Sequence, residues 1–123
     1  MLKIAAVVLG VMLPVAAYAT EAKIVVLYGH PKSTEEFDKY YKEKHAPMVH
    51  AVKAVKRFEV AKPAPGPNGA PPPYYLVVDI LFESLESLRA TAATDEWKAI
   101  AADVPNFATG GATPFVAVVQ PTK

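Results

Sequence analysis

The sequence contains no cysteine. This absence excludes a disulfide framework, a thiol nucleophile and a zinc site built from cysteines. The chain also lacks a large excess of either charge: its formal net charge is +1, which gives no electrostatic reason to expect a nucleic acid or an acidic lipid as a partner. The patterns G-x-G-x-x-G, G-K-[ST] and G-x-S-x-G are absent as well. The sequence therefore predicts neither a nucleotide cofactor nor a nucleic-acid-binding role.

Three histidines are the remaining candidates for metal ligands. His30, His45 and His50 match no ligand spacing such as H-x-x-x-H, and no carboxylate lies at a fixed register with them. Pro47 lies between His45 and His50, so these two need not share a helix face. The sequence therefore predicts no metal site and no bound cofactor.

Residues 1–19 have the three parts of a secretory signal peptide. The chain starts with the short, positively charged Met1–Lys3, continues with an apolar run at 4–15, and then has the small-x-small cleavage signal Ala17-Tyr18-Ala19. We expect cleavage near Ala19 and a mature protein in the periplasm or outside the cell, without stable membrane insertion. The alternative is a retained anchor, but Pro14 interrupts the run, and a spanning helix needs about 20 apolar residues.

Residues 20–123 are enough for one domain and too few for two. Hydrophobic residues make up 52% of the chain and charged residues 20%, a balance typical of globular proteins. Residues 62–73 hold half of the 12 prolines. We expect this segment to be a long, stiff hairpin loop rather than a domain linker, because each flank is too short to fold alone.

Four strands and two helical regions alternate along this domain. Apolar or alternating stretches predict strands at 23–28, 57–61, 74–82 and 114–119. Ser33 and Ser84 are the expected N-caps of the two helical regions, and the first should end or kink near His45, because a proline disfavours helical geometry in the residue before it. The order β-α-β-β-α-β predicts an α+β, ferredoxin-like fold: a four-stranded antiparallel sheet with two helices on one face.

Three of these strands are apolar on both faces. In the first, Ile24, Val26 and Tyr28 share one face, and Val25 and Leu27 share the other. Two helices cover only one face of such a sheet, so the other face would expose an apolar patch. We therefore expect a homodimer in which two sheets face each other. The alternative is a monomer with a partly apolar surface.

His45 is the main candidate for chemistry. Phe37, Tyr41 and His45 recur every four residues, which places them on one helix face. If Phe37 packs on the sheet, His45 points into the space between helix and sheet, where it could exchange a proton with a ligand. Tyr28, at the end of the first strand, could supply a hydroxyl nearby. The alternatives are a packed histidine bonded to a carbonyl group and a core tyrosine with its hydroxyl at the rim.

Asp79 lies among apolar residues in the middle of the third strand. Aspartate is depleted in strands, and burying an unpaired carboxylate is costly. We expect Asp79 to pair with Arg57 or Lys56 on the neighbouring strand. The alternative is a catalytic base with a raised pKa.

Several motifs together resemble those of the EthD family, named for a protein of ethyl tert-butyl ether degradation. They are Phe37-Asp38-x-Tyr40-Tyr41-x3-His45-x-Pro47, Pro73-Tyr74-Tyr75, Phe82-Glu83-Ser84-Leu85-Glu86-Ser87-Leu88 and Asn106-Phe107-Ala108-Thr109-Gly110-Gly111. The resemblance spans about Lys23 to Val119. It implies a dimeric α+β barrel, with His45 as the family histidine and with Asp38, Tyr41 and Pro47 around it. Family members are often called reductases without a well-defined reaction. Relatives in the wider superfamily include cofactor-independent monooxygenases, isomerases and cyclases that use a histidine and a tyrosine.

Three functional hypotheses follow. The first is an enzyme without a bound cofactor that acts on a small hydrophobic carbonyl, phenolic or ether-derived compound, with His45 as the acid/base and Tyr28 or Tyr41 orienting the substrate. The second is a non-catalytic dimer that binds a hydrophobic small molecule. The third is an oxidoreductase using a diffusible cofactor, which requires an open basic cleft that the sequence does not indicate; export would also separate it from cytosolic NAD(P)H. The expected pocket residues are Phe37, Asp38, Met48, Phe82, Trp97 and Phe107.

Overall fold

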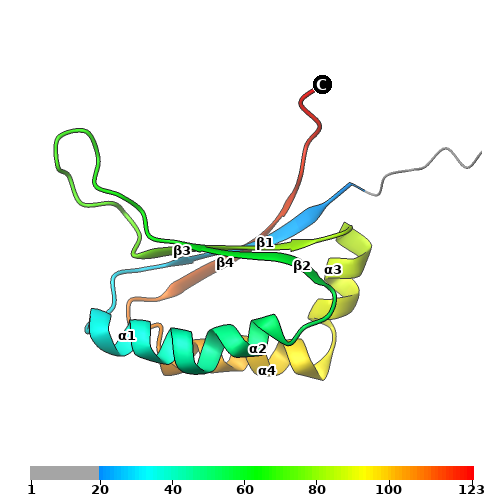
Figure 1. Ribbon diagram of the computed structural model, residues 1–123, viewed down its shortest axis with the longest axis horizontal. Coiled ribbons are helices and arrows are strands. Elements are labelled where there is room, and N and C mark those ends of the chain that lie inside the picture. Colours follow the sequence, from blue (N-terminus) through cyan, green and yellow to red (C-terminus); the bar gives the residue numbers. More distant parts are fainter. Residues whose placement is uncertain (1–19) are drawn as a thin grey trace, which may run out of the picture.

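The computed structural model of the protein describes residues 20–123. The signal peptide predicted at residues 1–19 lies outside this part of the chain. Four strands form one antiparallel sheet in the order β2-β3-β1-β4, and the helices of residues 20–123 lie on one side of it (Figure 1). The predicted α+β, ferredoxin-like arrangement is therefore confirmed.

The strands are β1 (Ala22–Tyr28), β2 (Val55–Ala61), β3 (Leu76–Phe82) and β4 (Ala112–Val118). The helical segments are α1 (Thr34–Tyr40), η1 (Tyr41–His45), α2 (Ala46–His50), α3 (Leu85–Ala92), α4 (Asp95–Asp103) and η2 (Val104–Asn106). Each predicted strand is present, with ends shifted by at most two residues. Within the part of the chain that the structure describes, no helix has the length and hydropathy needed to cross a bilayer.

The first helical region was predicted to end or kink near His45, but it continues past this residue into α2; at this point it forms a π-helical turn, η1. Before it, Ser33 caps α1 as expected, because its Oγ accepts a hydrogen bond from the N–H of Glu36 at 3.2 Å. The N–H of Ala46 donates to the carbonyl of Tyr41, the i to i+5 pattern of a π turn. This wider turn leaves both Tyr41 and His45 on the buried side of the helix.

The core lies between the sheet and the helices. Alternate residues of β1 and β3 face the helices and are buried: Ile24, Val26, Tyr28, Leu76, Val78, Ile80 and Phe82. The helical side contributes Phe37, Tyr41, Val49, Leu88 and Ile100, together with Phe107 from the loop after η2. Aromatic rings gather at the end of β1, where Phe107 lies 5.5 Å from Tyr28 and 5.3 Å from Phe37 between ring centroids.

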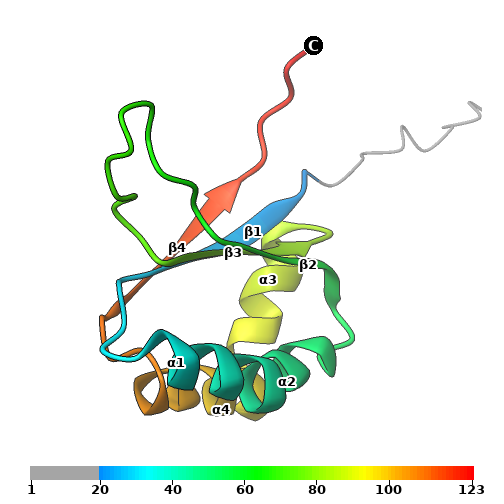
Figure 2. The ribbon, with the colours of Figure 1, turned by 60° about the vertical axis from the view of Figure 1, so that its left-hand side comes forward.

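The proline-rich loop connects β2 and β3, which are antiparallel neighbours, so the predicted long hairpin connection is confirmed. The loop rises on the side of the sheet away from the helices (Figure 2). Its two ends are fixed near α1: the hydroxyl of Tyr75 donates to Oδ1 of Asp38 at 2.7 Å, and Nζ of Lys62 lies 2.9 Å from Oδ2 of the same carboxylate. His30, which follows β1, also contacts the loop, with its Nε2 lying 2.8 Å from the carbonyl oxygen of Pro72.

The face of the sheet away from the helices is partly apolar and partly charged. Val25 of β1 pairs in register with Phe115 of β4, and the side chain of Phe115 is 45% exposed. Leu27 lies on the same face as Val25. Charged residues occupy the neighbouring part of this face: Lys23, Arg57, Glu59 and Asp79.

Asp79 has a different partner from the predicted one. It forms an ion pair with Lys23 of β1 at 2.9 Å, so the prediction of a pair with Arg57 or Lys56 is wrong. The reason is the register, which places Glu59 of β2 directly opposite Asp79. Arg57 pairs with that Glu59 at 3.2 Å instead. Asp79 is thus a charge-paired residue of the surface.

Candidate functional site

A cavity of about 250 Å³ lies between the helix-covered face of the sheet and the helices. Among the described residues, its polar lining consists of Tyr28, Tyr41 and His45, beside the indole of Trp97. The other lining residues are apolar: Ile24, Val26, Val78, Ile80, Ala112 and Pro114 from the sheet, and Val49, Ile100, Ala101, Val104 and Pro105 from the helical side. An apolar cavity with a few convergent polar groups is typical of a small-molecule site.

The polar residues of the cavity come from β1 and η1. Tyr28 is the last residue of β1, and Tyr41 and His45 are the first and last residues of η1. The ring centroids of Tyr28 and Tyr41 are 5.9 Å apart, and those of Tyr41 and His45 are 5.3 Å apart. His45 is only 3% exposed. The four-residue spacing and the end of the strand therefore bring these side chains to one end of the cavity.

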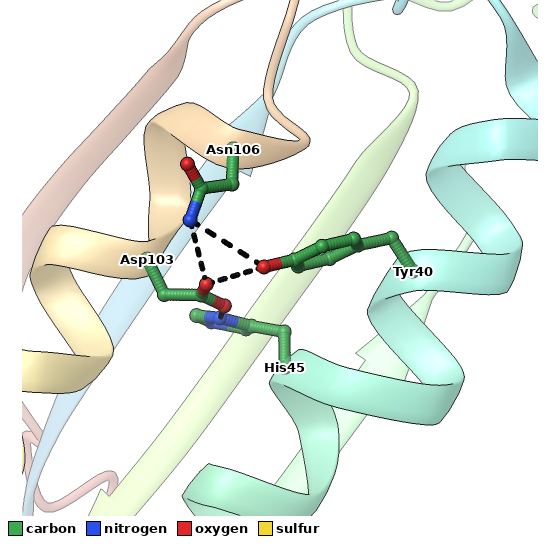
Figure 3. A network of polar contacts seen from close by, with 4 residues as sticks. All are labelled: Tyr40, His45, Asp103 and Asn106. Atoms are coloured by element: carbon green, nitrogen blue, oxygen red, sulfur yellow. Dashed lines mark hydrogen bonds and ion pairs between the residues drawn. The ribbon is translucent and has the colours of Figure 1, made fainter.

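His45 is paired with Asp103, the last residue of α4 (Figure 3). Nδ1 of His45 lies 2.9 Å from Oδ2 of Asp103. The other carboxylate oxygen, Oδ1, accepts hydrogen bonds from the hydroxyl of Tyr40 at 2.6 Å and from Nδ2 of Asn106 at 3.0 Å. Figure 3 shows that Tyr40 and His45 come from one helical segment and that Asp103 and Asn106 come from another. This network therefore ties together two parts of the chain that are distant in sequence.

Asp103 stays ionised although its side chain is only 13% exposed. Burial acts to raise the pKa of Asp103, but hydrogen bonds from Tyr40, His45 and Asn106 outweigh it and hold that pKa below its usual value. An ionised carboxylate only accepts hydrogen bonds, so the proton in the contact with His45 lies on Nδ1. In the neutral imidazole, Nε2 then carries the lone pair.

Nε2 of His45 and the hydroxyls of Tyr28 and Tyr41 have no hydrogen-bond partner within residues 20–123. In the same part of the chain, no polar side-chain atom that is sealed from solvent lacks a partner. These three atoms are therefore not sealed, and we infer that they face the cavity that their residues line. The lone pair of Nε2 is thus directed at a space in which a ligand would lie.

Both tyrosine hydroxyls of the cavity are held in the neutral form. Burial raises the pKa of Tyr28, and the negative charge of Asp103 raises it further. Burial also raises the pKa of Tyr41, with a further contribution from Tyr28. A neutral phenol donates a hydrogen bond through its O–H. The polar end of the cavity therefore offers two donors and one imidazole lone pair.

Two of the residues predicted for the pocket lie at the site. Trp97 lines the cavity from α4. Phe107 packs against the imidazole of His45, with ring centroids 4.6 Å apart, and is itself buried. Phe107 therefore supports the orientation of His45 from the side of η2.

The structure does not bring the other predicted pocket residues into the cavity. Phe37 and Phe82 are buried in the surrounding core, and Met48 packs against that core. Asp38 lies outside the cavity, with its carboxylate bound to Tyr75 and Lys62. These residues shape the fold around the site without lining it.

Sequence reasoning missed Asp103 and its supporting residues, Tyr40 and Asn106. One signal was present in the sequence. Asp103 ends a helix, where the negative end of the helix dipole disfavours a carboxylate, and the last turn of α4 has no basic residue to compensate. A carboxylate in that position needs a partner from elsewhere, which His45 and Tyr40 supply.

The lining also bears on cofactors and metals. Among the described residues that line the cavity there is no lysine or arginine, so it lacks the basic character that the oxidoreductase hypothesis requires. Within residues 20–123, no group of three or more histidine, aspartate or glutamate side chains is arranged to hold a metal ion. The chemistry that this arrangement supports directly is proton transfer and hydrogen bonding.

Comparison with known proteins gives consistent matches. Residues 30–111 match the EthD domain. The chain is 37% identical over 91 residues to an uncharacterized 11.0 kDa protein of the thcB-thcC intergenic region of Rhodococcus erythropolis, covering 74% of this chain and 87% of that protein. Its structure is similar to an EthD family protein from Bacillus halodurans (TM-score 0.75, 27% identity, 81% and 99% covered). It is also similar to an EthD-like protein from Ralstonia eutropha (TM-score 0.68, 23% identity, 86% and 97% covered).

More distant structures share the fold alone. One is a dimeric ferredoxin-like protein from Thermobifida fusca (TM-score 0.61, 11% identity, 82% of this chain and 92% of that chain covered). Another is SnoaB, a cofactor-independent oxygenase from Streptomyces nogalater (TM-score 0.59, 11% identity, 85% of this chain and 96% of that chain covered). A third is the hydroxynitrile lyase from Passiflora edulis (TM-score 0.65, 12% identity, 86% of this chain and 98% of that chain covered).

Proposed function

Because the chain belongs to the EthD domain family and pairs a buried histidine with a carboxylate beside an apolar cavity, we propose that it is an enzyme without a bound cofactor, in which His45 is a general acid/base acting on a small hydrophobic compound. The observation that carries this proposal is the contact between Nδ1 of His45 and Asp103 in a histidine that lines the cavity. The fold is also that of an oxygenase described as cofactor-independent, which agrees with the proposal.

In the proposed reaction, Nε2 of His45 takes a proton from a C–H or O–H group of the substrate. The carboxylate of Asp103 stabilises the imidazolium that forms. The hydroxyl of Tyr28 or Tyr41 donates to the substrate oxygen on which negative charge develops. The proton then returns from Nε2 to the product, so the protein ends in its starting state. The apolar walls strengthen each of these electrostatic interactions, because they keep the local dielectric low.

The proposal is tested by following proton transfer directly. Acetophenone and resorcinol are suitable probes, because each is a single-ring molecule whose carbon-bound protons exchange slowly with neutral D₂O. Proton NMR measures the loss of those signals with and without the protein. We expect the protein to accelerate exchange of at least one probe. Binding of both probes without acceleration would contradict the enzyme and would favour the non-catalytic binding protein.

We propose further that the protein acts as a homodimer in which the faces of the two sheets away from the helices meet. The exposed Phe115 beside Val25 supports this arrangement, since an apolar patch gains stability when it is covered. The ion pair between Lys23 and Asp79 on the same face already has its charges matched within one chain. The related fold from Thermobifida fusca is described as dimeric.

Replacing Phe115 with Lys is expected to convert the dimer into a monomer, because it places an unpaired charge in the proposed interface. Size-exclusion chromatography with light scattering measures the change. Val60→Lys is the matched control, because Val60 is 44% exposed but pairs with Val78, on the helix-side face of the sheet. A wild-type monomer, or a Phe115→Lys variant that remains dimeric, would contradict the arrangement.

We propose that the chain is exported and cleaved after Ala19, on the basis of the signal-peptide pattern alone. When the full chain is expressed in a Gram-negative host, the intact mass of the protein in the periplasmic fraction should correspond to residues 20–123. Full-length protein in the membrane fraction would instead indicate a retained anchor.

A further inference from the structure

The polar end of the cavity sets a requirement on the head group of a ligand. Nε2 of His45 needs a hydrogen-bond donor, while the hydroxyls of Tyr28 and Tyr41 need an acceptor. A single hydroxyl group supplies both the donor and the acceptor: its O–H donates to Nε2, and its oxygen accepts from a tyrosine. An ether oxygen only accepts, and it would leave Nε2 unpaired in an apolar space. Sites built to bind a hydroxyl strongly reject analogues that lack it.

The charge of the site favours a neutral ligand. The ionised carboxylate of Asp103 lies directly behind His45, at 2.9 Å from Nδ1. The described lining residues include no lysine or arginine that would pair with a carboxylate or phosphate. Moving such an anion out of water without a partner is costly. The apolar walls instead suit a hydrocarbon body.

The volume of the cavity limits the size of that body. The cavity measures about 250 Å³, which is below the range of about 300–1,000 Å³ for drug-sized ligands. An apolar cavity of about 150 Å³ holds one benzene molecule. By proportion, this cavity holds about ten non-hydrogen atoms, which is one ring with small substituents. A fused system of three rings would extend beyond this space.

From these three constraints we infer that the ligand of this site is a neutral, single-ring phenol whose hydroxyl donates to Nε2 of His45 and accepts from Tyr28 or Tyr41. The inference rests on the proposed function, and it selects the phenolic class from the carbonyl, phenolic and ether-derived compounds. A phenol suits the site better than an aliphatic alcohol, because its more acidic O–H is the stronger donor to an imidazole.

Trp97 makes the inference directly testable, because it is the single tryptophan of the chain and lines the cavity. Its fluorescence, excited at wavelengths longer than those that the probes absorb, reports whether the cavity is occupied. The probes are phenol, its methyl ether anisole, and toluene, which match in size and differ in the head group. We expect phenol to bind at least tenfold more tightly than anisole or toluene. Calorimetry with 9-phenanthrol, a phenol of three fused rings, should show no binding.

Two variants locate the head group. Tyr28→Phe and Tyr41→Phe each remove one hydroxyl and keep the ring. We expect at least one of them to lower the affinity for phenol, because the bond to the tyrosine is lost and only the bond to His45 remains, while toluene binding stays unchanged. If anisole or toluene binds wild-type protein as tightly as phenol, or if phenol does not bind at all, the head-group inference is overturned. Tight binding of 9-phenanthrol would overturn the size limit.

These measurements separate the ligand inference from the proposed enzyme. Phenol binding without any hydrogen exchange in resorcinol or acetophenone would contradict the acid/base function and leave the ligand class standing. Exchange of acetophenone, together with equal binding of phenol and toluene, would contradict the ligand class and leave the acid/base function standing.

Discussion

Replacing His45 with Gln is expected to lower the rate of protein-catalysed hydrogen exchange by about 10²–10⁴-fold, the usual contribution of a general acid/base. The glutamine amide is polar and similar in reach, but it takes up no proton at neutral pH. Asp103→Asn should also lower the rate, because the amide no longer stabilises an imidazolium on His45. Asp103 acts through His45, so Asp103→Glu, which keeps the carboxylate, should recover part of the rate. Proton NMR in D₂O measures all three variants.

Asp38→Asn is the matched control for the variants at His45 and Asp103. Asp38, like Asp103, accepts a hydrogen bond from a tyrosine hydroxyl, here Tyr75 at 2.7 Å, and its pKa is likewise lowered. It lies outside the cavity, so its replacement should leave the exchange rate unchanged. If Asp38→Asn and Asp103→Asn lower the exchange rate equally, both substitutions act by disturbing the fold and not by changing His45. If a folded His45→Gln variant catalyses hydrogen exchange at the wild-type rate, His45 is not the general acid/base.

Local patterns predict the part of the site that one segment builds. The spacing of Phe37, Tyr41 and His45 places all three on the buried face of the first helical region, as the structure has them. The same pattern does not predict which of them lines the cavity. Phe37 is buried one turn before Tyr41 and fills the core, and Asp38 lies about 100° further round the helix, on its outer side.

The partners of charged groups are the part that the sequence does not reveal. His45 and Asp103 are 58 residues apart, and their contact depends on how α4 packs beside η1. No local periodicity records that packing. The ion pair of Asp79 with Lys23 depends in the same way on the register of β1 against β3. Strand alternation predicts the face on which Asp79 lies, but it does not predict which neighbouring strand supplies the opposite charge.

The cavity also depends on a close crossing of two backbones beside Tyr28. The N–H of Gly29 donates to the carbonyl of Gly111 at 3.0 Å, so the end of β1 is tied to the loop that leads into β4. At this crossing the backbone of Gly29 lies against that of Gly110, and a side chain at either position would collide with main-chain atoms of the other segment. This loop begins with Phe107, which packs against His45, and it follows η2, whose last residue, Asn106, donates to Asp103.

Replacing Gly110 with Ala is therefore expected to destabilise the protein strongly. The added methyl group would overlap the carbonyl group of His30, and backbone moves aside less readily than a flexible side chain. We expect the free energy of unfolding to fall by about 3 kcal/mol, at the upper end of the usual range for overpacking. This corresponds to a melting temperature lower by about 10 °C or more, measured by circular dichroism. In Gly66→Ala, the nearest atoms, those of Ala70, lie at 3.8 Å, so the change should stay within about 0.5 kcal/mol. Equal melting temperatures for the two variants would show that the crossing is looser than the structure indicates. The position of Phe107 against His45 would then not depend on the close approach of Gly110 to His30.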